Sequence, residues 1–174
     1  MIGFVVEDPA LQHIATEVSR KLRIVIRKEN IRLMDGDDLE KAKRYVRDLV
    51  ERRRCQRVVV LKDKLGAPPD VEERFTRMGF ASQSVLVLAV GEAESWFLAD
   101  HEAISEYLQA RVRSVSNPES LLHPKERLKS IFKSHRKAYN EGGRDPQELA
   151  QRMRPEVVAP KCPSFQKLID VIQG

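Results

Sequence analysis

The sequence has few of the residues that mark several familiar classes of protein. Only 2 of its 174 residues are cysteine, and 6% are aromatic. Cys55 and Cys162 stand far apart, so we expect neither a disulfide framework nor a paired-cysteine zinc site. No apolar run has the length that a bilayer requires, and we identify no signal peptide and no membrane span. We therefore expect a cytoplasmic protein without a membrane partner.

Charge is plentiful but unevenly distributed. Charged residues make up 33% of the chain, and the net charge is +5. Residues 1–110 hold 18 Lys and Arg against 19 Asp and Glu, whereas residues 111–161 hold 12 against 6. The positive excess of the second segment favours contact with a polyanion at low salt. Basic helices that only solvate a surface would give the same excess.

Short apolar runs alternate with amphipathic stretches in the first hundred residues. Buried strands are predicted at 2–6, 57–61 and 85–90, and a further strand at 24–26, at 31–33 or at both. Helices are predicted to follow Asp8-Pro9, the turn at residues 35–38, and Asp70, because these residues are typical of helix starts. Strands that alternate with helices at this spacing indicate a three-layer α/β fold with a mostly parallel sheet of about four strands.

The second part of the chain, residues 101–174, is predicted to be mainly helical. Prolines and the pair Gly142-Gly143 divide it into helices at 101–110, 125–134, 147–153 and 164–172. Neither a repeat nor a clear interdomain linker interrupts the sequence. We therefore expect residues 1–174 to form a single domain in which this basic helical extension packs on the sheet.

Acidic residues follow three of the predicted strands. Glu7 ends the first strand, Asp63 follows the strand at 57–61, and Glu92 and Glu94 follow the strand at 85–90. Because the carboxyl ends of parallel strands share one edge of a sheet, we expect these side chains to converge. Converging carboxylates repel one another unless a cation neutralises them, and oxygen ligands suit Mg²⁺ or Mn²⁺. Such an ion could orient a phosphodiester and a water molecule.

The stretches VVED, VVVLKD, VGEAESWFLAD, HPK and CPSF occur along the chain in this order. In this respect the chain resembles, from Glu7 to Phe165, an uncharacterised TOPRIM-like family catalogued as domain of unknown function 4276. TOPRIM domains occur in topoisomerases, primases and overcoming-lysogenization-defect nucleases. They hold Mg²⁺ with a glutamate after the first strand and a later Asp-x-Asp motif. The resemblance implies a TOPRIM/Rossmann-like fold and Mg²⁺-dependent, nuclease-like processing of nucleic acids, with a setting in prokaryotic defence.

The resemblance also assigns roles to individual residues. Glu7 matches the glutamate and Asp63 the first aspartate of the motif, and Glu94 would be a further ligand or a base that positions water. The predicted catalytic residues are therefore Glu7, Asp63 and Glu94, and Asp100 joins them as a predicted metal ligand. The alternative for Asp100 is the N-cap of the next helix. For Trp96, in the same motif, a place in the core is favoured over a base-stacking role.

Basic residues near these carboxylates are candidates for contact with the phosphate backbone of a nucleic acid. We assign this role to Lys62, Lys64, Lys125, Arg127 and Lys129. An alternative is that the two lysines beside Asp63 compensate its charge without any metal ion, and that the others are solvated.

Two departures from the TOPRIM pattern support a different function. Leu65 occupies the position of the second aspartate, and Asp8 stands where a glycine commonly follows the glutamate. The chain could therefore be a non-catalytic subunit that binds nucleic acid or serves a partner ATPase. A third alternative is a phosphoacceptor receiver domain with Asp63 as acceptor, although Ala89-Val90-Gly91 stands where that fold needs a Ser or Thr.

Overall fold

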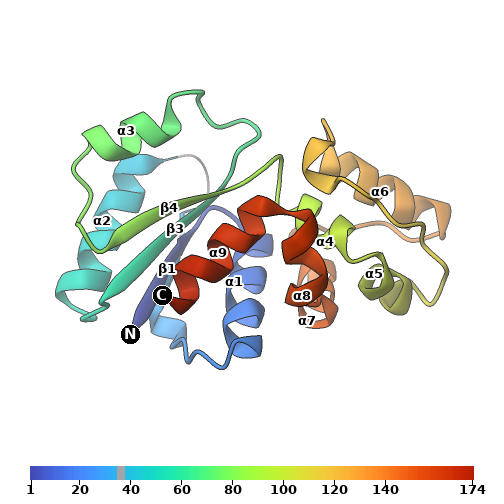
Figure 1. The fold of residues 1–174 in the computed structure, drawn as a ribbon, viewed down its shortest axis with the longest axis horizontal. Coiled ribbons are helices and arrows are strands. Elements are labelled where there is room, and N and C mark those ends of the chain that lie inside the picture. The colour runs from blue at the N-terminus through green and yellow to red at the C-terminus, as the bar shows by residue number, and fades with distance from the viewer. Residues whose placement is uncertain (35–37) are drawn as a thin grey trace.

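A computed structural model describes residues 1–34 and 38–174 and shows an α/β fold (Figure 1). Strands β1 (Ile2–Val6), β2 (Ile31–Leu33), β3 (Arg57–Asp63) and β4 (Ser84–Ala89) form one parallel sheet in the order β2-β1-β3-β4. This confirms the predicted fold class. Of the two candidates for the second strand, residues 31–33 pair with β1 and residues 24–26 do not.

The first three helices connect successive strands. They are α1 (Pro9–Lys21), α2 (Leu39–Glu51) and α3 (Val71–Arg77). The side chain of Asp8 caps α1 by accepting a hydrogen bond from the Leu11 N–H at 2.8 Å, and Asp38 caps α2 in the same way. The predicted turn at residues 35–38 otherwise lies outside the described residues.

Helices cover both faces of the sheet (Figure 1). Successive side chains of a strand point to opposite faces, and each face has its own apolar cluster. Phe4, Val59 and Val87 pack with α1 and the C-terminal helices, whereas Val5 and Val60 pack with α2 and α3. Because strands buried on both faces need apolar residues throughout, the continuous runs of the sequence predicted them correctly.

The chain after β4 is helical, as predicted. It forms α4 (Glu94–Ala99), α5 (His101–Leu108), α6 (Pro124–Ser134), α7 (Arg144–Arg152), α8 (Pro155–Val158) and α9 (Pro163–Gln173). Helix α9 packs against β4, and α7 packs against α1, so this segment extends one face of the sheet. Within the described residues, no helix has both the length and the apolar character needed to cross a membrane.

Candidate carboxylate site

The carboxyl ends of β1 and β3 meet where the strand order reverses. Ligands of open α/β sheets bind at this point, because the connections leave the two strands toward opposite faces. Glu7 follows β1, and Asp63 is the last residue of β3. The Asp63 N–H donates a hydrogen bond to Oε2 of Glu7 at 2.9 Å. The structure therefore brings these two predicted site residues together at one edge of the sheet.

Asp63 lies in a crowded acidic environment. Its side chain is only 8% exposed, and Oδ1 accepts a hydrogen bond from the Ala93 N–H at 2.8 Å. Burial raises the pKa of Asp63 to about 9, and the negative charges of Asp8, Glu94 and Glu7 contribute to the shift. Four carboxylates from three segments thus affect one another, and without a cation Asp63 holds a proton at neutral pH.

Glu94, at the start of α4, is the most deeply buried member of this group. It is 1% exposed, and Oε1 accepts a hydrogen bond from the hydroxyl of Tyr139 at 3.2 Å. Its second oxygen, Oε2, is buried and has no hydrogen-bond partner among the described residues. Burial raises the pKa of Glu94 to about 7, although Lys125 opposes the shift. Glu94 can therefore gain or lose a proton near neutral pH.

Two members of the site were not assigned to it from the sequence. Asp8 was predicted only as a helix cap, yet burial raises its pKa and its charge acts on both Asp63 and Glu94. Tyr139 follows α6 and reaches Glu94 across 45 residues of sequence. Burial and Glu94 together raise the pKa of Tyr139 above its usual range. Asp8 could have been suspected from its position beside Glu7, whereas no motif marks Tyr139.

The structure corrects the prediction for Lys62. This side chain is 0% exposed, and its ammonium lies 3.2 Å from Oε2 of Glu7. A lysine without exposed surface does not meet a phosphate backbone from solvent. The alternative considered for this residue, charge compensation at the site, agrees with its position beside Glu7.

Lys125 and Lys129 form ion pairs at the start of α6. The Lys125 ammonium lies 3.5 Å from Glu92 and 3.2 Å from Glu141, and Lys129 also pairs with Glu141 at 3.6 Å. The Lys125 backbone N–H donates to Glu92 at 3.0 Å, which fixes α6 to the segment after β4. Lys64 and Arg127 are exposed. Of the five basic residues predicted to contact nucleic acid, these two have solvent-facing side chains.

The junction between β4 and α4 depends on a glycine. Gly91 has a φ of 75°, a conformation that residues with side chains rarely adopt. A Cβ atom at this position would lie 3.0 Å from Cγ of Pro124 and 3.1 Å from Oγ of Ser95. Close contact between this turn and the first residue of α6 therefore needs glycine.

Asp100 has contacts of a different kind. It caps α5 through the Ala103 N–H at 3.2 Å, and Arg154 donates to its two oxygens at 3.0 and 2.6 Å. The largest contributions to the pKa shifts of Asp63 and Glu94 come from other groups. The structure thus does not bring Asp100 together with the other predicted ligands, and the cap predicted as its alternative role is present.

We expect Asp100→Asn to destabilise the protein by about 2–3 kcal/mol at pH 7, since charged hydrogen bonds contribute about this much. Burial raises the pKa of Asp100, but hydrogen bonds from Arg154 and the backbone outweigh burial and lower it. This stabilisation is complete above the unfolded-state pKa of about 3.9 and is lost as the pH falls through the lower folded-state value. Urea denaturation at several pH values should show the difference between variant and wild type shrinking in acid.

The matched control for this prediction is Glu102→Gln. Glu102 pairs with the same arginine at 2.7 Å but is exposed, so its loss should cost less than about 1 kcal/mol. A difference between Asp100→Asn and wild type that stayed constant down to pH 2 would contradict the assignment.

Leu65 and a cavity between α2 and α3 add no predicted ligand to the site. Leu65, at the position that the resemblance assigns to the second aspartate, is 47% exposed.

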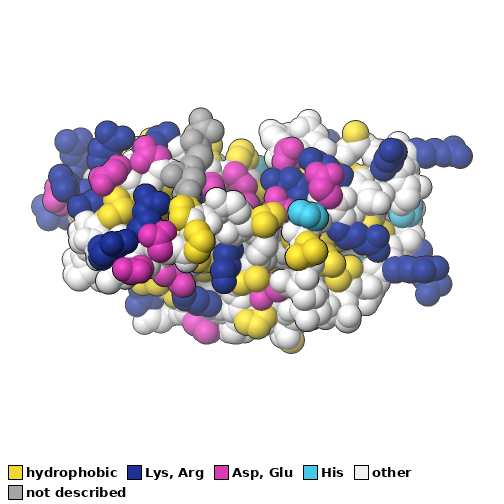
Figure 2. All heavy atoms as spheres, turned by 90° about the horizontal axis from the view of Figure 1, so that it is seen from above, with side chains coloured by type: hydrophobic (Ala, Val, Ile, Leu, Met, Phe, Trp, Pro, Cys, Tyr) yellow, Lys and Arg dark blue, Asp and Glu magenta, His cyan; other side chains and the backbone are white. Residues whose placement is uncertain are grey.

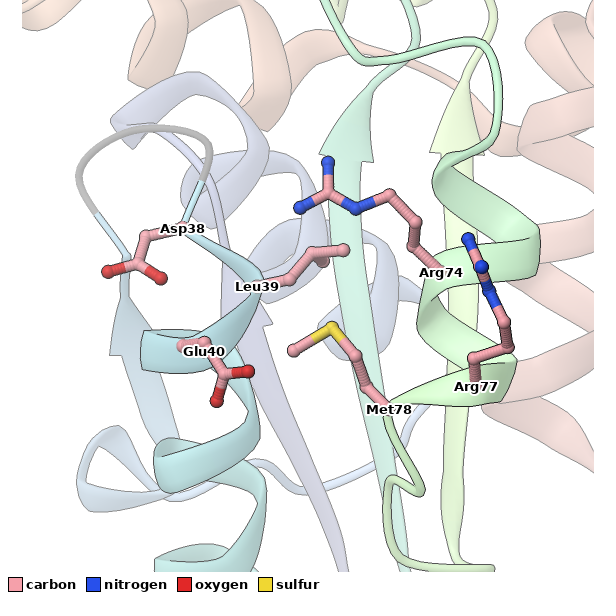
Figure 3. Close-up of a pocket in the computed structure, with 6 residues that line it drawn as sticks. All are labelled: Asp38, Leu39, Glu40, Arg74, Arg77 and Met78. Atoms are coloured by element: carbon pink, nitrogen blue, oxygen red, sulfur yellow. The ribbon is translucent and has the colours of Figure 1, made fainter.

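A cavity of 440 Å³ between α2 and α3 contains none of the predicted site residues (Figure 3). There Arg74 extends from α3 toward α2, with Leu39 and Met78 between the two helices. Among residues 1–34 and 38–174, no three Asp, Glu, His or Cys side chains are grouped as ligands of one metal ion.

The comparisons with known proteins agree with this fold. The family model described as Domain of unknown function (DUF4276) matches residues 9–173. A solved structure of the C-terminal region of the Xanthomonas campestris pv. campestris OLD protein is similar, with a TM-score of 0.51 and 18% sequence identity. The similarity covers 98% of this chain and 93% of that one. At this identity it shows a common fold. No curated protein sequence matches the chain.

Proposed function

Because this chain belongs to the DUF4276 family and has the fold of the OLD C-terminal region, we propose that it is a metal-dependent enzyme that cleaves phosphodiester bonds of nucleic acids. The observation that carries the proposal is the buried pair Asp63 and Glu94 beside Glu7 at the switch point of the sheet. Buried carboxylates with strongly raised pKa values are characteristic of functional sites. The proposed setting in prokaryotic defence follows from the resemblance alone.

The chemistry of these residues fits a divalent ion. Glu7, Asp63 and Glu94 offer only oxygen donors, which Mg²⁺ and Mn²⁺ prefer. Oε2 of Glu94 is buried without a hydrogen-bond partner among the described residues, so it remains available as a ligand. A bound ion would offset the mutual repulsion of the carboxylates and would supply an activated water and charge stabilisation for in-line displacement.

The side chains of the site have separate roles in this mechanism. Glu7 and Asp63 would hold the metal ion, and the hydrogen bond from the Asp63 backbone N–H to Glu7 fixes their relative position. Glu94, with a pKa of about 7, loses its proton near neutral pH and would complete the ligand set through its unpartnered Oε2. The hydroxyl of Tyr139 orients the Glu94 carboxylate.

Calorimetric titration with Mn²⁺ tests the metal site. We expect Glu94→Gln to bind Mn²⁺ at least about tenfold more weakly than the wild type, because it loses a charged ligand. Glu73→Gln is the matched control, since Glu73 is exposed on α3. Mn²⁺ should also raise the melting temperature of the wild type and of Glu73→Gln more than that of Glu94→Gln. Equal affinities for all three proteins would exclude Glu94 from the site.

A second candidate function is a non-catalytic subunit with a metal-free site. The observation that favours it is the buried Lys62, which compensates Glu7 from within the protein. Leu65 supplies no carboxylate at the second TOPRIM position. In this case the wild type would show no heat of Mn²⁺ binding, and nucleic-acid binding would be independent of divalent ions. The receiver alternative has less support, since no fifth strand occurs in the described part of the chain.

A further inference from the structure

A second, strongly basic cavity lies between α6 and the segment that follows α5. It has a volume of 290 Å³. The polar side chains that line it are those of Arg111, Arg113, Arg127, Ser130, Ser134 and His135. We call it the arginine pocket. It shares no residue with the carboxylate site.

The segment after α5 contributes Arg111 and Arg113 to one wall of the arginine pocket. Helix α5 ends at Gln109, which has a left-handed φ of 53°. Beyond it, the Val112 N–H donates to Oγ of Ser105 at 3.0 Å, and the Val112 side chain is buried. Val112 is buried, whereas Arg111 and Arg113 on either side of it are exposed, and both line the cavity.

One face of α6 forms the other side of the pocket. Residues 127, 130, 131 and 134 are spaced three or four apart, so their side chains form a single stripe along the helix. Leu128 and Phe132 point into the core and fix the helix in this orientation. Arg127 therefore faces the two arginines of the preceding segment.

The charge of the arginine pocket is not compensated. No described residue forms an ion pair or a side-chain hydrogen bond with the guanidinium groups of Arg111, Arg113 or Arg127, and no described Asp or Glu lines the cavity. By contrast, Lys125 and Lys129 of the same basic segment 111–161 form ion pairs with Glu141, and Lys125 also with Glu92. The Lys and Arg side chains at the end of the molecule formed by α5 and α6 are visible in Figure 2.

We propose that the arginine pocket binds the phosphate backbone of a polynucleotide strand. Guanidinium groups match the oxygens of a phosphate in a planar, two-point geometry, and hydroxyls such as those of Ser130 and Ser134 can donate to the same group. The choice of a polynucleotide rests on the function proposed above. The backbone N–H of Lys125, at the start of α6, contacts Glu92, and the pocket residues of the same helix run from Arg127 to Ser134, a rise of about 10 Å. A strand bound along this stripe would therefore approach the carboxylate site at the start of α6.

Fluorescence anisotropy with labelled 20-nucleotide single-stranded DNA and RNA tests this site. The measurements are made in EDTA, so that binding is separated from metal-dependent cleavage. The triple variant Arg111→Gln, Arg113→Gln, Arg127→Gln should bind at least about tenfold more weakly than the wild type in moderate salt. The slope of log affinity against log salt concentration should fall by about 2, as expected for three lost phosphate contacts.

The matched control is Arg52→Gln, Arg53→Gln, Arg54→Gln, which removes the same charge from exposed positions at the end of α2. It should change affinity less than about threefold. Equal weakening in both triple variants, or no binding of either strand by the wild type, would overturn the proposal. Weaker binding by the pocket variant alone would support the arginine pocket even if the wild type did not bind Mn²⁺. The proposed metal site and the proposed arginine pocket can therefore be disproved independently.

Discussion

Asp63→Asn is expected to lower metal-dependent cleavage of nucleic acid at least about 100-fold and, at the same time, to stabilise the metal-free protein. The loss of activity follows from the loss of a charged ligand at the proposed centre. The gain in stability follows from burial, because Asp63 is nearly inaccessible to water and surrounded by three other carboxylates. An asparagine keeps an oxygen that can accept the hydrogen bond from the Ala93 N–H.

The pKa shift of Asp63 determines whether the stability of the protein rises or falls with pH. The pKa of Asp63 is about 9 in the folded protein, against about 3.9 in the unfolded chain. The folded state therefore binds a proton that the unfolded state releases, and stability falls as the pH rises between these values. In EDTA, the free energy of unfolding of Asp63→Asn should exceed that of the wild type by about 1–3 kcal/mol at pH 8. Below about pH 4 the two free energies should be equal.

Urea denaturation at pH 4, 6 and 8 and a cleavage assay with Mn²⁺ measure the two effects. Asp170→Asn serves as the matched control, because Asp170 is exposed on α9. It should leave both quantities unchanged. A variant at position 63 that is less stable than the wild type at pH 8 would show that Asp63 is a structural residue and not a strained member of a site.

The second large effect is expected at Trp96, the only tryptophan of the chain. Trp96 is fully buried, and its ring packs edge-on against Phe165 with centroids 5.2 Å apart. Its indole N–H donates to Oγ of Ser164 at 2.9 Å, which links α4 to α9. Trp96→Ala should reduce the free energy of unfolding by about 3–5 kcal/mol, since it leaves a large cavity.

Trp96→Phe separates packing from hydrogen bonding. It retains most of the apolar surface but leaves Ser164 without one partner, so we expect a cost of about 1–3 kcal/mol. Unfolding is best followed by circular dichroism, because both variants lack the fluorescent side chain. If Trp96→Ala lost less stability than Trp96→Phe, Trp96 would not be a core residue. A role in stacking on a base would then be favoured.

Apolar patterning was sufficient to predict most of the sheet. The runs at β1, β3 and β4 are continuous because both faces are covered, and each was located to within two residues. The second strand was ambiguous, because Ile24 and Ile26 also pack against the core without pairing. Only the register with β1, in which Phe4 lies opposite Ile31, distinguishes the two segments.

The candidate site was predictable in its position and less so in its detail. Glu7 and Asp63 could be placed together, because parallel topology determines where strand ends lie. Tyr139 and the burial of Lys62 depend on how later helices and side chains pack around that edge. Contacts across such long stretches of sequence leave no local pattern, so they emerge only from coordinates.

The contact between Gly91 and Pro124 couples the position of the turn after β4 to the position of α6. At this point a Cβ atom on Gly91 would lie 3.0 Å from Cγ of Pro124, the first residue of α6, so Pro124 would have to shift to make room. A larger residue in place of Gly91 would press on Pro124 and would shift the turn that leads to Glu92 and Glu94. Because Pro124 and Lys125 at the start of α6 both contact the segment after β4, substitutions in α6 are expected to change the positions of the acidic residues in that segment.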